Sequence, residues 1–136
     1  MAKYSAYGMI IARGAVTVAQ VRSISGPGLS VDTVDVTSHD SLEAWEEVVP
    51  TILRSGEVTL EIIYDPAEAT HKNSSGGLLA DLVGRAAVTY NLKFPDLATT
   101  TWSFSAFVTG FEPSGVVDGE LMANVTLKLT GKPTLV

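Results

Sequence analysis

The sequence lacks cysteine entirely, which excludes disulfide bonds and thiolate metal sites. It is also poor in charge: 18% of its 136 residues are charged, against roughly 25% in typical soluble domains. Basic residues are the scarcer kind, nine against fifteen acidic ones, for a net charge of −6. That balance argues against a protein that binds nucleic acid or anionic lipid through phosphate contacts. No apolar run is long enough for a membrane span or a signal peptide, so we expect neither membrane contact nor export by a recognisable signal.

What the chain does contain is apolar and patterned. Hydrophobic residues make up 46% of the sequence, and its length is that of one ordinary domain. We therefore expect a single domain over residues 1–136 that folds around one core. Its apolar content exceeds what a small monomer readily covers, which favours association with other copies or partners.

Alternation with a period of two dominates the sequence and predicts β-strands. Over residues 57–65, for example, Val58, Leu60 and Ile62 share one face, with Glu57 and Glu61 on the other. One apolar face and one polar face is typical of antiparallel sheet. The same pattern recurs over residues 88–94, 101–109 and 120–130, and more weakly over 15–22 and 29–37, where a slip in phase between residues 31 and 34 predicts a β-bulge. The prediction is a mainly β protein with six or seven strands.

Two helical segments interrupt the strands. Residues 77–86 place an apolar stripe of Leu78, Leu82, Val83 and Ala86 at helical spacing, with Ser74 or Ser75 as the N-cap, and we expect this helix to cover an open side of the sheet. Asp40 and Glu43 resemble a capping box that opens a short turn through Trp45, which Pro50 cannot continue.

A long excursion over residues 39–55 separates two strands. Loops of this length in compact domains usually serve a function or are disordered. This one is too apolar for disorder, so we expect it to dock on another surface. The residues expected to make that contact are Trp45, Val48, Val49, Ile52 and Leu53.

No group of residues predicts catalysis, a cofactor or a metal. His39, Asp40 and Ser41 have the residue types of a hydrolytic triad, but adjacent residues cannot generally align as nucleophile, base and orienting group. The only other histidine, His71, has no partner at metal-ligand spacing. Glu57 and Glu61 would lie about 13 Å apart along a strand, beyond the carboxylate spacing of glycosidases. We therefore expect a protein that is not an enzyme.

Three segments carry a resemblance to a known family. They are VRSISGPGLSVDTVDVTSHDS (residues 21–41), EEVVPTILRSGEVTLEIIYDP (residues 46–66) and VTGFEPSGVVDGELMANVTLKLTGKPT (residues 108–134). In this order and spacing they resemble the tail tube proteins, or major tail proteins, of long-tailed (siphovirus-type) phages. The resemblance covers the chain from about residue 15 onward, and the N-terminal residues 1–14 match least.

The resemblance implies an antiparallel β-sandwich with one flanking helix, the tail-tube fold. Six copies would form a ring whose inner sheets join in one β-barrel, and rings would stack into the tube through which DNA leaves the capsid. Residues 39–55 would be the contact between rings, and an N-terminal arm over residues 1–14 would add contacts through Tyr7 and Ile10. Glu57, Glu61 and Asp65 are the candidates for the lumen wall, past which double-stranded DNA slides without specific binding.

The same resemblance implies a tape measure protein and a tail terminator as partners, and a place in the virion tail after assembly in the host cytoplasm. Two other readings stay open. One is a different virion part of related fold, namely a tail terminator or the tube protein of an injection system. The other is a small-ligand β-barrel, which large residues such as Tyr90, Trp102 and Phe104 disfavour because they would fill its cavity.

Overall fold

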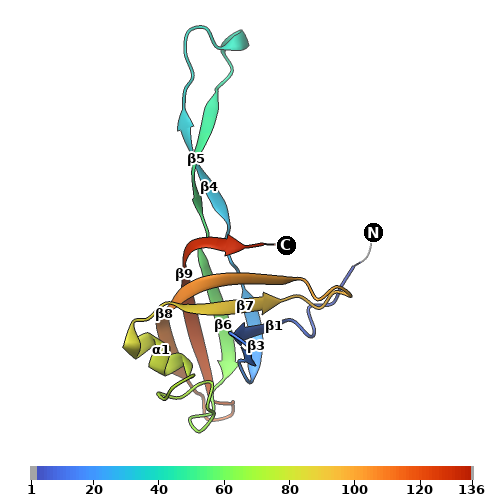
Figure 1. The fold of residues 1–136 in the computed structure, drawn as a ribbon, viewed down its shortest axis with the longest axis vertical. Helices are drawn as coiled ribbons and strands as arrows, with labels where there is room; N and C mark the ends of the chain where they lie inside the picture. Colours follow the sequence, from blue (N-terminus) through green and yellow to red (C-terminus); the bar gives the residue numbers. More distant parts are fainter. Residues whose placement is uncertain (1–2, 136) are drawn as a thin grey trace.

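The computed structural model describes residues 3–135 and is dominated by β-strands (Figure 1). One short α-helix and one turn of 3₁₀-helix accompany them. In chain order the elements are β1 (Ile10–Arg13), β2 (Val16–Thr17), β3 (Val21–Ser25), β4 (Ser30–Asp35), η1 (Leu42–Ala44), β5 (Val48–Arg54), β6 (Glu57–Ile63), α1 (Leu78–Gly84), β7 (Val88–Lys93), β8 (Thr101–Ser114) and β9 (Met122–Thr134).

Seven strands form a single antiparallel sheet in the order β2-β1-β7-β8-β9-β6-β3. The long strands β8 and β9 belong to both halves of this sheet: β8 pairs with β7 through Thr101–Ala106 and continues beside β9 as far as Ser114. Register shifts between β8 and β9 accompany the bend, as expected where a strand changes direction. In Figure 1, β7 and β1 run crosswise to β6 and β9, so the sheet folds over itself. The predicted sandwich with one flanking helix is confirmed, with one sheet supplying both layers.

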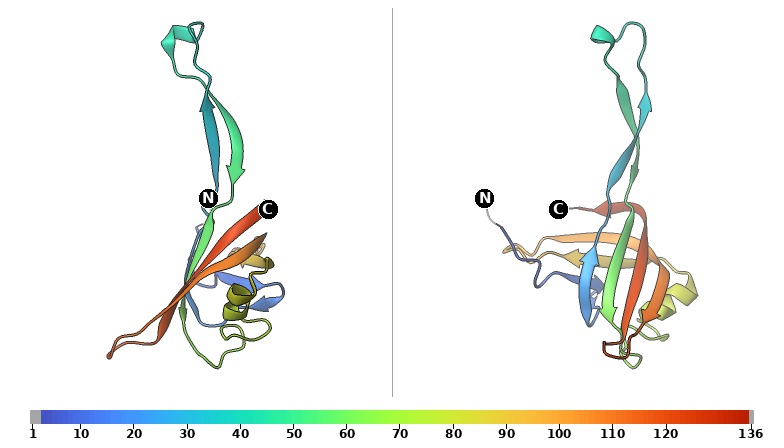
Figure 2. Two further views of the ribbon diagram at one scale, coloured as in Figure 1. Left: turned by 90° about the vertical axis from the view of Figure 1, so that its left-hand side faces the viewer. Right: turned by 180° about the vertical axis from the view of Figure 1, so that it is seen from behind.

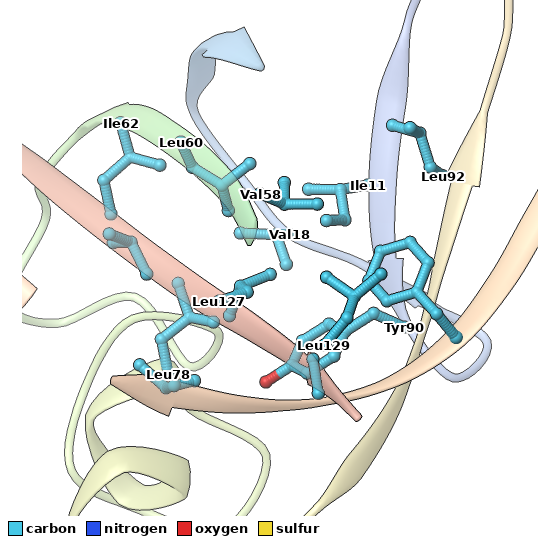
Figure 3. Packing of buried hydrophobic residues seen from close by; sticks show 14 of the residues in the cluster. Ile11, Val18, Val58, Leu60, Ile62, Leu78, Tyr90, Leu92, Leu127 and Leu129 are labelled. Atoms are coloured by element: carbon cyan, nitrogen blue, oxygen red, sulfur yellow. The ribbon is translucent and has the colours of Figure 1, made fainter. Parts of the chain in front are cut away.

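The core lies between the two halves of the sheet (Figure 3). The period-two alternation predicted over residues 57–65 and 120–130 is observed from Val58 to Ile62 and from Ala123 to Leu129, where every second residue is buried; Leu121, also predicted to face inward, is 43% exposed. Burying such side chains contributes roughly 1.5–3 kcal/mol each. The largest fully buried side chains are Tyr90, Ile11, Leu60, Ile62, Leu78, Leu92, Leu127, His71, Val58 and Val125.

Aromatic residues occupy the space that a small-ligand barrel would keep open. Tyr90 and Phe104 are buried between the layers, and Trp102 packs against the same cluster. The seven-stranded sheet is not closed, since β2 and β3 form its two edges. These observations argue against the ligand-barrel reading.

Helix α1 is shorter than predicted and is capped differently. Its N-cap is Gly77, with no side-chain hydrogen bond, so neither Ser74 nor Ser75 has the expected role. Leu78 is buried and Leu82 is half-buried, but Val83 is 61% exposed, so only part of the predicted stripe packs on the core. The helix ends at Gly84 because the next residue adopts a left-handed conformation.

A buried carboxylate fixes α1 to the sheet. Asp81 accepts hydrogen bonds from the Arg13 guanidinium at 2.8 and 2.9 Å and from the Tyr90 hydroxyl at 2.7 Å. Asp81 is 6% exposed, so its charge is compensated by Arg13 rather than by water. The hydrogen bond to Asp81 raises the pKa of the Arg13 guanidinium further. Burial, and then the hydrogen bond to Asp81, raise the pKa of the Tyr90 hydroxyl well above its usual value.

Strands β4 and β5 pair with each other alone and project from the sheet as a long hairpin (Figures 1 and 2). The pair contains a bulge, but on the other strand from the one predicted: the two steps from Val31 to Thr33 on β4 match three steps from Leu53 to Pro50 on β5, so the extra residue lies on β5 and β4 stays regular. The loop expected over residues 39–55 was only partly right, because its second half, Val48–Arg54, is strand β5. We define residues 30–54 as the hairpin and residues 36–47 as its tip.

The predicted capping box at the tip was wrong. Ser41, not Asp40, precedes the 3₁₀ turn, and it makes no side-chain cap hydrogen bond. Glu43 has φ of 53° and therefore cannot reach back as a capping residue would. The short turn ending at Trp45 is nevertheless present.

The chain's first strands also differ from the sequence prediction. The arm expected over residues 1–14 ends earlier, since Ile10 pairs with Lys93 and begins β1; among the described residues only 3–9 precede the sheet. The single strand expected over residues 15–22 is divided between β2 and β3, with Gln20 at φ of 60° between them.

The helices within residues 3–135 are too short to cross a membrane.

Candidate assembly surfaces

The hairpin exposes large apolar side chains along its whole length. Every residue of β5 is exposed. Trp45 at the tip is 72% exposed and Leu53 near the base is 83% exposed. The other residues predicted to make contacts, Val48, Val49 and Ile52, are exposed as well. Contiguous apolar surface of this kind is rare on monomers and typical of interaction sites.

Cross-strand pairing places apolar residues on both faces of the hairpin. Val31 lies opposite Leu53, and Val34 lies opposite Val49. Because side chains alternate along β4, Val31 and Val34 point to opposite faces. A two-stranded hairpin is marginally stable by itself in water. Covering both of its faces requires surfaces beyond this chain's own sheet.

The base of the hairpin is a tight backbone crossing. Gly56 has φ of +71°, and a Cβ there would lie 2.5 Å from the Gly28 carbonyl oxygen. A Cβ on Gly26, at φ of +104°, would clash with the Glu57 carbonyl oxygen. Glycine is the residue type that meets both requirements.

Polar contacts hold the two strands of the hairpin together. Arg54 Nε and Nη2 each lie 2.8 Å from Asp32 Oδ2, and this contact lowers the pKa of the Asp32 carboxyl. Thr51 donates to the Asp32 carbonyl. Close backbone contacts and these hydrogen bonds therefore define the base of the hairpin, which we call the joint, in place of a flexible linker.

The tip has its own hydrogen-bond network. The buried Ser41 hydroxyl accepts from the Ser38 amide at 2.9 Å and donates to Glu47 Oε2 at 3.1 Å. Thr37 bonds to the Glu47 backbone in both directions. His39 is exposed, and among the described residues its ring makes no hydrogen bond with Ser41. The arrangement shapes a loop and does not align a nucleophile with a base.

His71 is buried and has a structural position. Its Nε2 lies 2.6 Å from the Ala19 carbonyl, and the Asp65 amide donates to its Nδ1 at 3.4 Å. The ring thus ties the segment after β6 to the segment between β2 and β3. Within residues 3–135, no three histidine or acidic side chains are grouped so that they could hold a metal ion.

Strands β3, β6, β9 and β8 lie side by side (Figure 2, right), and the side chains on their outer face are largely polar. Glu61 lies between Ser23 and Asn124, and the next row across contains Thr59 and Thr126. Glu57, one of the predicted lumen residues, lies opposite Lys128 at 3.9 Å between charged groups. Threonine, serine and carboxylate side chains thus fill the middle of the face that points away from the core, and the register places Lys128, Phe107, Met122 and Ile63 on that face as well.

Asp65, the third residue predicted for the lumen, lies beyond the end of β6. It is exposed, and its Oδ1 accepts from the Ala67 amide in the following turn. It therefore sits at the margin of the polar face, whereas Glu57 and Glu61 lie on paired strand.

The same four strands have two open edges. Strand β3 has no partner beyond β6. Strand β8 pairs with β7 only as far as Ala106, so within the described part of the chain no strand covers its second half, Phe107–Ser114, on the side away from β9. Unpaired edges of this kind invite pairing with another strand.

The N-terminal segment lies near a shallow groove. Tyr4 and Met9 line this groove with Phe94 and Trp102, whose rings meet edge to face at 5.1 Å between centroids. Tyr7 is 92% exposed. Ile10, the other residue predicted to contact a neighbour, is half-buried on β1.

A further exposed apolar group was missed by the sequence analysis. Val116 and Val117 lie in the turn between β8 and β9 and are 74% and fully exposed. A pair of adjacent valines between Gly115 and Gly119 was the available signal, because glycine-bounded turns seldom carry β-branched residues.

No family model matches this chain, and no curated protein does. Solved structures match over nearly its full length. A chain in the virion of a native gene transfer agent particle is 16% identical, with a TM-score of 0.78, over 98% of this chain and 99% of that one.

Two further matches come from a gene transfer agent tail and from a contractile injection system. A chain in the tail of an empty gene transfer agent particle with C6 symmetry is 17% identical, with a TM-score of 0.72, over 98% of this chain and 99% of that one. A chain in the sheath/tube terminator structure of the extracellular contractile injection system PVC is also 17% identical, with a TM-score of 0.75, over 100% of this chain and 98% of that one. The chain therefore has the tail-tube fold, and that prediction is confirmed.

Proposed function

We propose that this protein is a structural subunit of a phage-type tail, in which six copies form a ring and stacked rings form a tube. Support comes from a fold shared, end to end, with a chain in a gene transfer agent virion and with a chain in a gene transfer agent tail of C6 symmetry. The observation that carries the proposal is the projecting hairpin, whose apolar residues have no cover within the subunit.

The hairpin supplies the contact between rings. Its side chains are exposed on both faces, so an adjacent ring buries what the subunit leaves in water. Large apolar side chains contribute roughly 1.5–3 kcal/mol each on full burial. Covering Trp45, Ile52 and Leu53 therefore stabilises the contact by several kcal/mol, part of which offsets the entropy lost on association.

Closure of the ring uses the two open edges of the polar sheet. In the sequence β3-β6-β9-β8 neighbouring strands alternate in direction. The free edge of β8 in one copy therefore runs antiparallel to β3 of the next when copies are arranged head to tail. Such a contact is heterologous and closes under rotation, which leaves a continuous barrel with no open edge.

The polar face then lines the lumen. Duplex DNA carries one negative charge per roughly 1.7 Å, so a cationic wall would hold it through counterion release. Glu57 and Glu61 lie on this wall, with Asp65 at its margin; Lys128 is opposite Glu57, so Glu61 carries the negative charge that has no cation across from it. The DNA passes without specific binding.

Reversing one charge tests this placement. We predict that Glu61→Lys leaves tube assembly intact and slows DNA ejection, because six added cations per ring attract phosphates. Ejection can be followed by the release of encapsidated DNA from particles carrying the variant. Asn73→Lys/Ser75→Lys, on two exposed residues outside the sheet, changes the net charge by the same two units and is the control. Unchanged ejection from Glu61→Lys particles would contradict the lumen placement.

The proposal includes further partners. A tape measure protein would set the number of rings and a terminator would end the stack. The mature location is the virion tail, after assembly in the host cytoplasm, and neither a membrane nor an enzymatic activity has a part in it. A siphovirus-type tail is the setting that the sequence resemblance favours.

A second candidate is the terminator itself. The similarity to a chain in a sheath/tube terminator structure supports it. The two functions differ in growth, since a tube subunit polymerises without limit whereas a terminator stops after one ring.

Negative-stain electron microscopy of the purified protein at high concentration distinguishes them. Stacked rings and tubes are expected of a tube subunit, and single rings of a terminator. Solitary subunits under every condition, together with absence of the protein from virus particles, would refute both.

A further inference from the structure

The turn between β8 and β9 combines two exposed valines with two carboxylates. Residues 115–121 form this turn, closed by a hydrogen bond from the Gly119 amide to the Val116 carbonyl at 3.1 Å. Val117 is fully exposed. Asp118 and Glu120 flank Gly119, and neither makes an ion pair within residues 3–135. We call residues 115–121 the β8–β9 turn.

A groove of matching character lies at the base of the hairpin. Its apolar lining comes from Ile52 and Leu53 on β5, from Leu129 on β9 and from Leu135 directly after β9. Lys128 and Lys132 line the same groove. In the described part of the chain no carboxylate lies within ion-pair distance of Lys132, and Lys128 has only a long contact with Glu57. We call this the basal groove.

These two features lie at opposite ends of the body. Figure 2 shows the β8–β9 turn at the foot of the molecule, while the hairpin base and the C-terminal end of β9 lie at the end from which the hairpin projects. The turn of a subunit therefore cannot reach its own groove. Two copies stacked along the long axis bring the foot of one to the groove of the other.

We infer that the β8–β9 turn of one copy docks into the basal groove of a copy in the adjacent ring. Val116 and Val117 would cover the exposed Leu53 and Leu135 of the groove, and Asp118 and Glu120 would approach Lys132 and Lys128. This inference rests on the proposed function, since it assigns the contact that joins successive rings. It also gives the stack a direction, because turn and groove are different surfaces at opposite ends of the subunit.

The charges select this occupant over the other exposed segments. The N-terminal segment carries Lys3, of the same sign as the groove. The hairpin tip is acidic and apolar like the turn, but it projects away from the groove beyond the same end of the molecule. A hairpin tip in the groove is therefore the alternative that an experiment has to separate.

Cysteine cross-linking separates them, because the natural chain contains no thiol. We expect Val117→Cys/Leu53→Cys tubes, once oxidised, to yield a ladder of covalent oligomers on a non-reducing gel. Each single-cysteine variant should give no ladder. Val117→Cys/Leu97→Cys is the matched control, since Leu97 is 97% exposed but does not line the groove. Trp45→Cys/Leu53→Cys tests the hairpin tip as occupant.

A charge swap provides a second measurement. Asp118→Lys alone and Lys132→Glu alone should each raise the protein concentration needed for tube growth, by roughly tenfold. Combining both changes in one chain should restore growth, because each contact then regains opposite charges.

The outcomes distinguish this inference from the function on which it rests. Tubes that form normally but give no ladder from the Val117/Leu53 pair, or a ladder only from the Trp45/Leu53 pair, would overturn the docking of the turn while leaving the tube intact. Failure of the unmodified protein to form rings or tubes would overturn the proposed function itself.

Discussion

The body and the hairpin are built from the same kinds of residue but differ in what covers them. Leu60 on β6 is fully buried, while Leu53, four residues before that strand begins, is 83% exposed. Both lie on antiparallel strands beside an antiparallel partner. The body has a second layer of the same sheet to pack against and the hairpin has none. An apolar strand therefore forms part of the core in the body, whereas in the hairpin it leaves apolar side chains exposed to water.

This difference in burial means that the apolar residues of the two regions stabilise different things. Core residues of the body stabilise the isolated subunit, whereas apolar residues of the hairpin contribute only when another copy covers them. The joint between the two regions belongs to folding, because Gly26 and Gly56 allow the backbones to cross at the base.

The largest effect on the isolated subunit is expected from a core leucine. Leu60→Ala should lower the free energy of unfolding by about 2–5 kcal/mol, because it leaves a cavity between packed layers. Urea denaturation below the concentration of assembly measures it. Leu53→Ala is the matched control and should change the stability by less than about 0.5 kcal/mol. Equal losses from the two variants would show that the hairpin is packed within the subunit.

A smaller effect is expected at the joint. Gly56→Ala should destabilise the subunit by about 2 kcal/mol, because alanine is strained at φ of +71° and its Cβ would crowd the Gly28 carbonyl. Thermal unfolding of the monomer would report this loss. Gly28→Ala has open space and should be neutral, so a similar loss there would contradict the account of the joint.

Alkaline pH tests the contact that holds α1 on the body. Burial, and then the hydrogen bond to Asp81, raise the pKa of Tyr90, so the folded state keeps a proton that the unfolded state releases near pH 10. Stability from this group is complete below about pH 10 and falls above it by up to about 1.4 kcal/mol per pH unit.

The variant Tyr90→Phe tests whether Tyr90 causes this fall in stability with rising pH. The variant retains the ring but lacks the ionisable hydroxyl, so its stability should decline less steeply above pH 10 than that of the natural protein. Identical slopes in chemical denaturation series across this range would show that Tyr90 is not the group responsible.

The sequence predicted the body better than the hairpin, for a physical reason. The alternation over residues 57–65 predicts a strand with one face packed on a core, and β6 has this alternating burial. Strand β5 contains Pro50, which was interpreted only as the end of a short helical turn, so no strand was predicted there. A strand in a two-stranded hairpin has one open side where a missing amide costs nothing, so proline is tolerated.

Contacts between residues far apart in the chain could not be predicted from the periodicity of apolar residues. Asp81 reads as a polar position on a helix, but Arg13, which pairs with it, lies 68 residues away in the chain. The helix cap failed for a related reason, since Gly77 is packed against the Lys72 backbone, where a serine's Cβ would not fit. Such contacts are decided by tertiary packing and leave no local signal.

The candidate surfaces were foreseen in part. Exposure of Trp45, Val48, Val49, Ile52 and Leu53 agrees with the expectation of a docking segment, and Glu57 and Glu61 lie on the expected polar face. Their contacts with other copies stay predictions. The basal groove could not be foreseen, because it joins the hairpin base to the last residues of the chain.

One measurement tests most directly the claim that the hairpin serves assembly and not folding. Trp45→Ser/Ile52→Ser removes two exposed apolar side chains, 72% and 58% exposed in the subunit. The account predicts an unchanged circular dichroism spectrum and urea midpoint, together with loss of tubes by electron microscopy at concentrations where the natural protein forms them. Normal tubes from this variant, or a subunit that no longer folds, would contradict it.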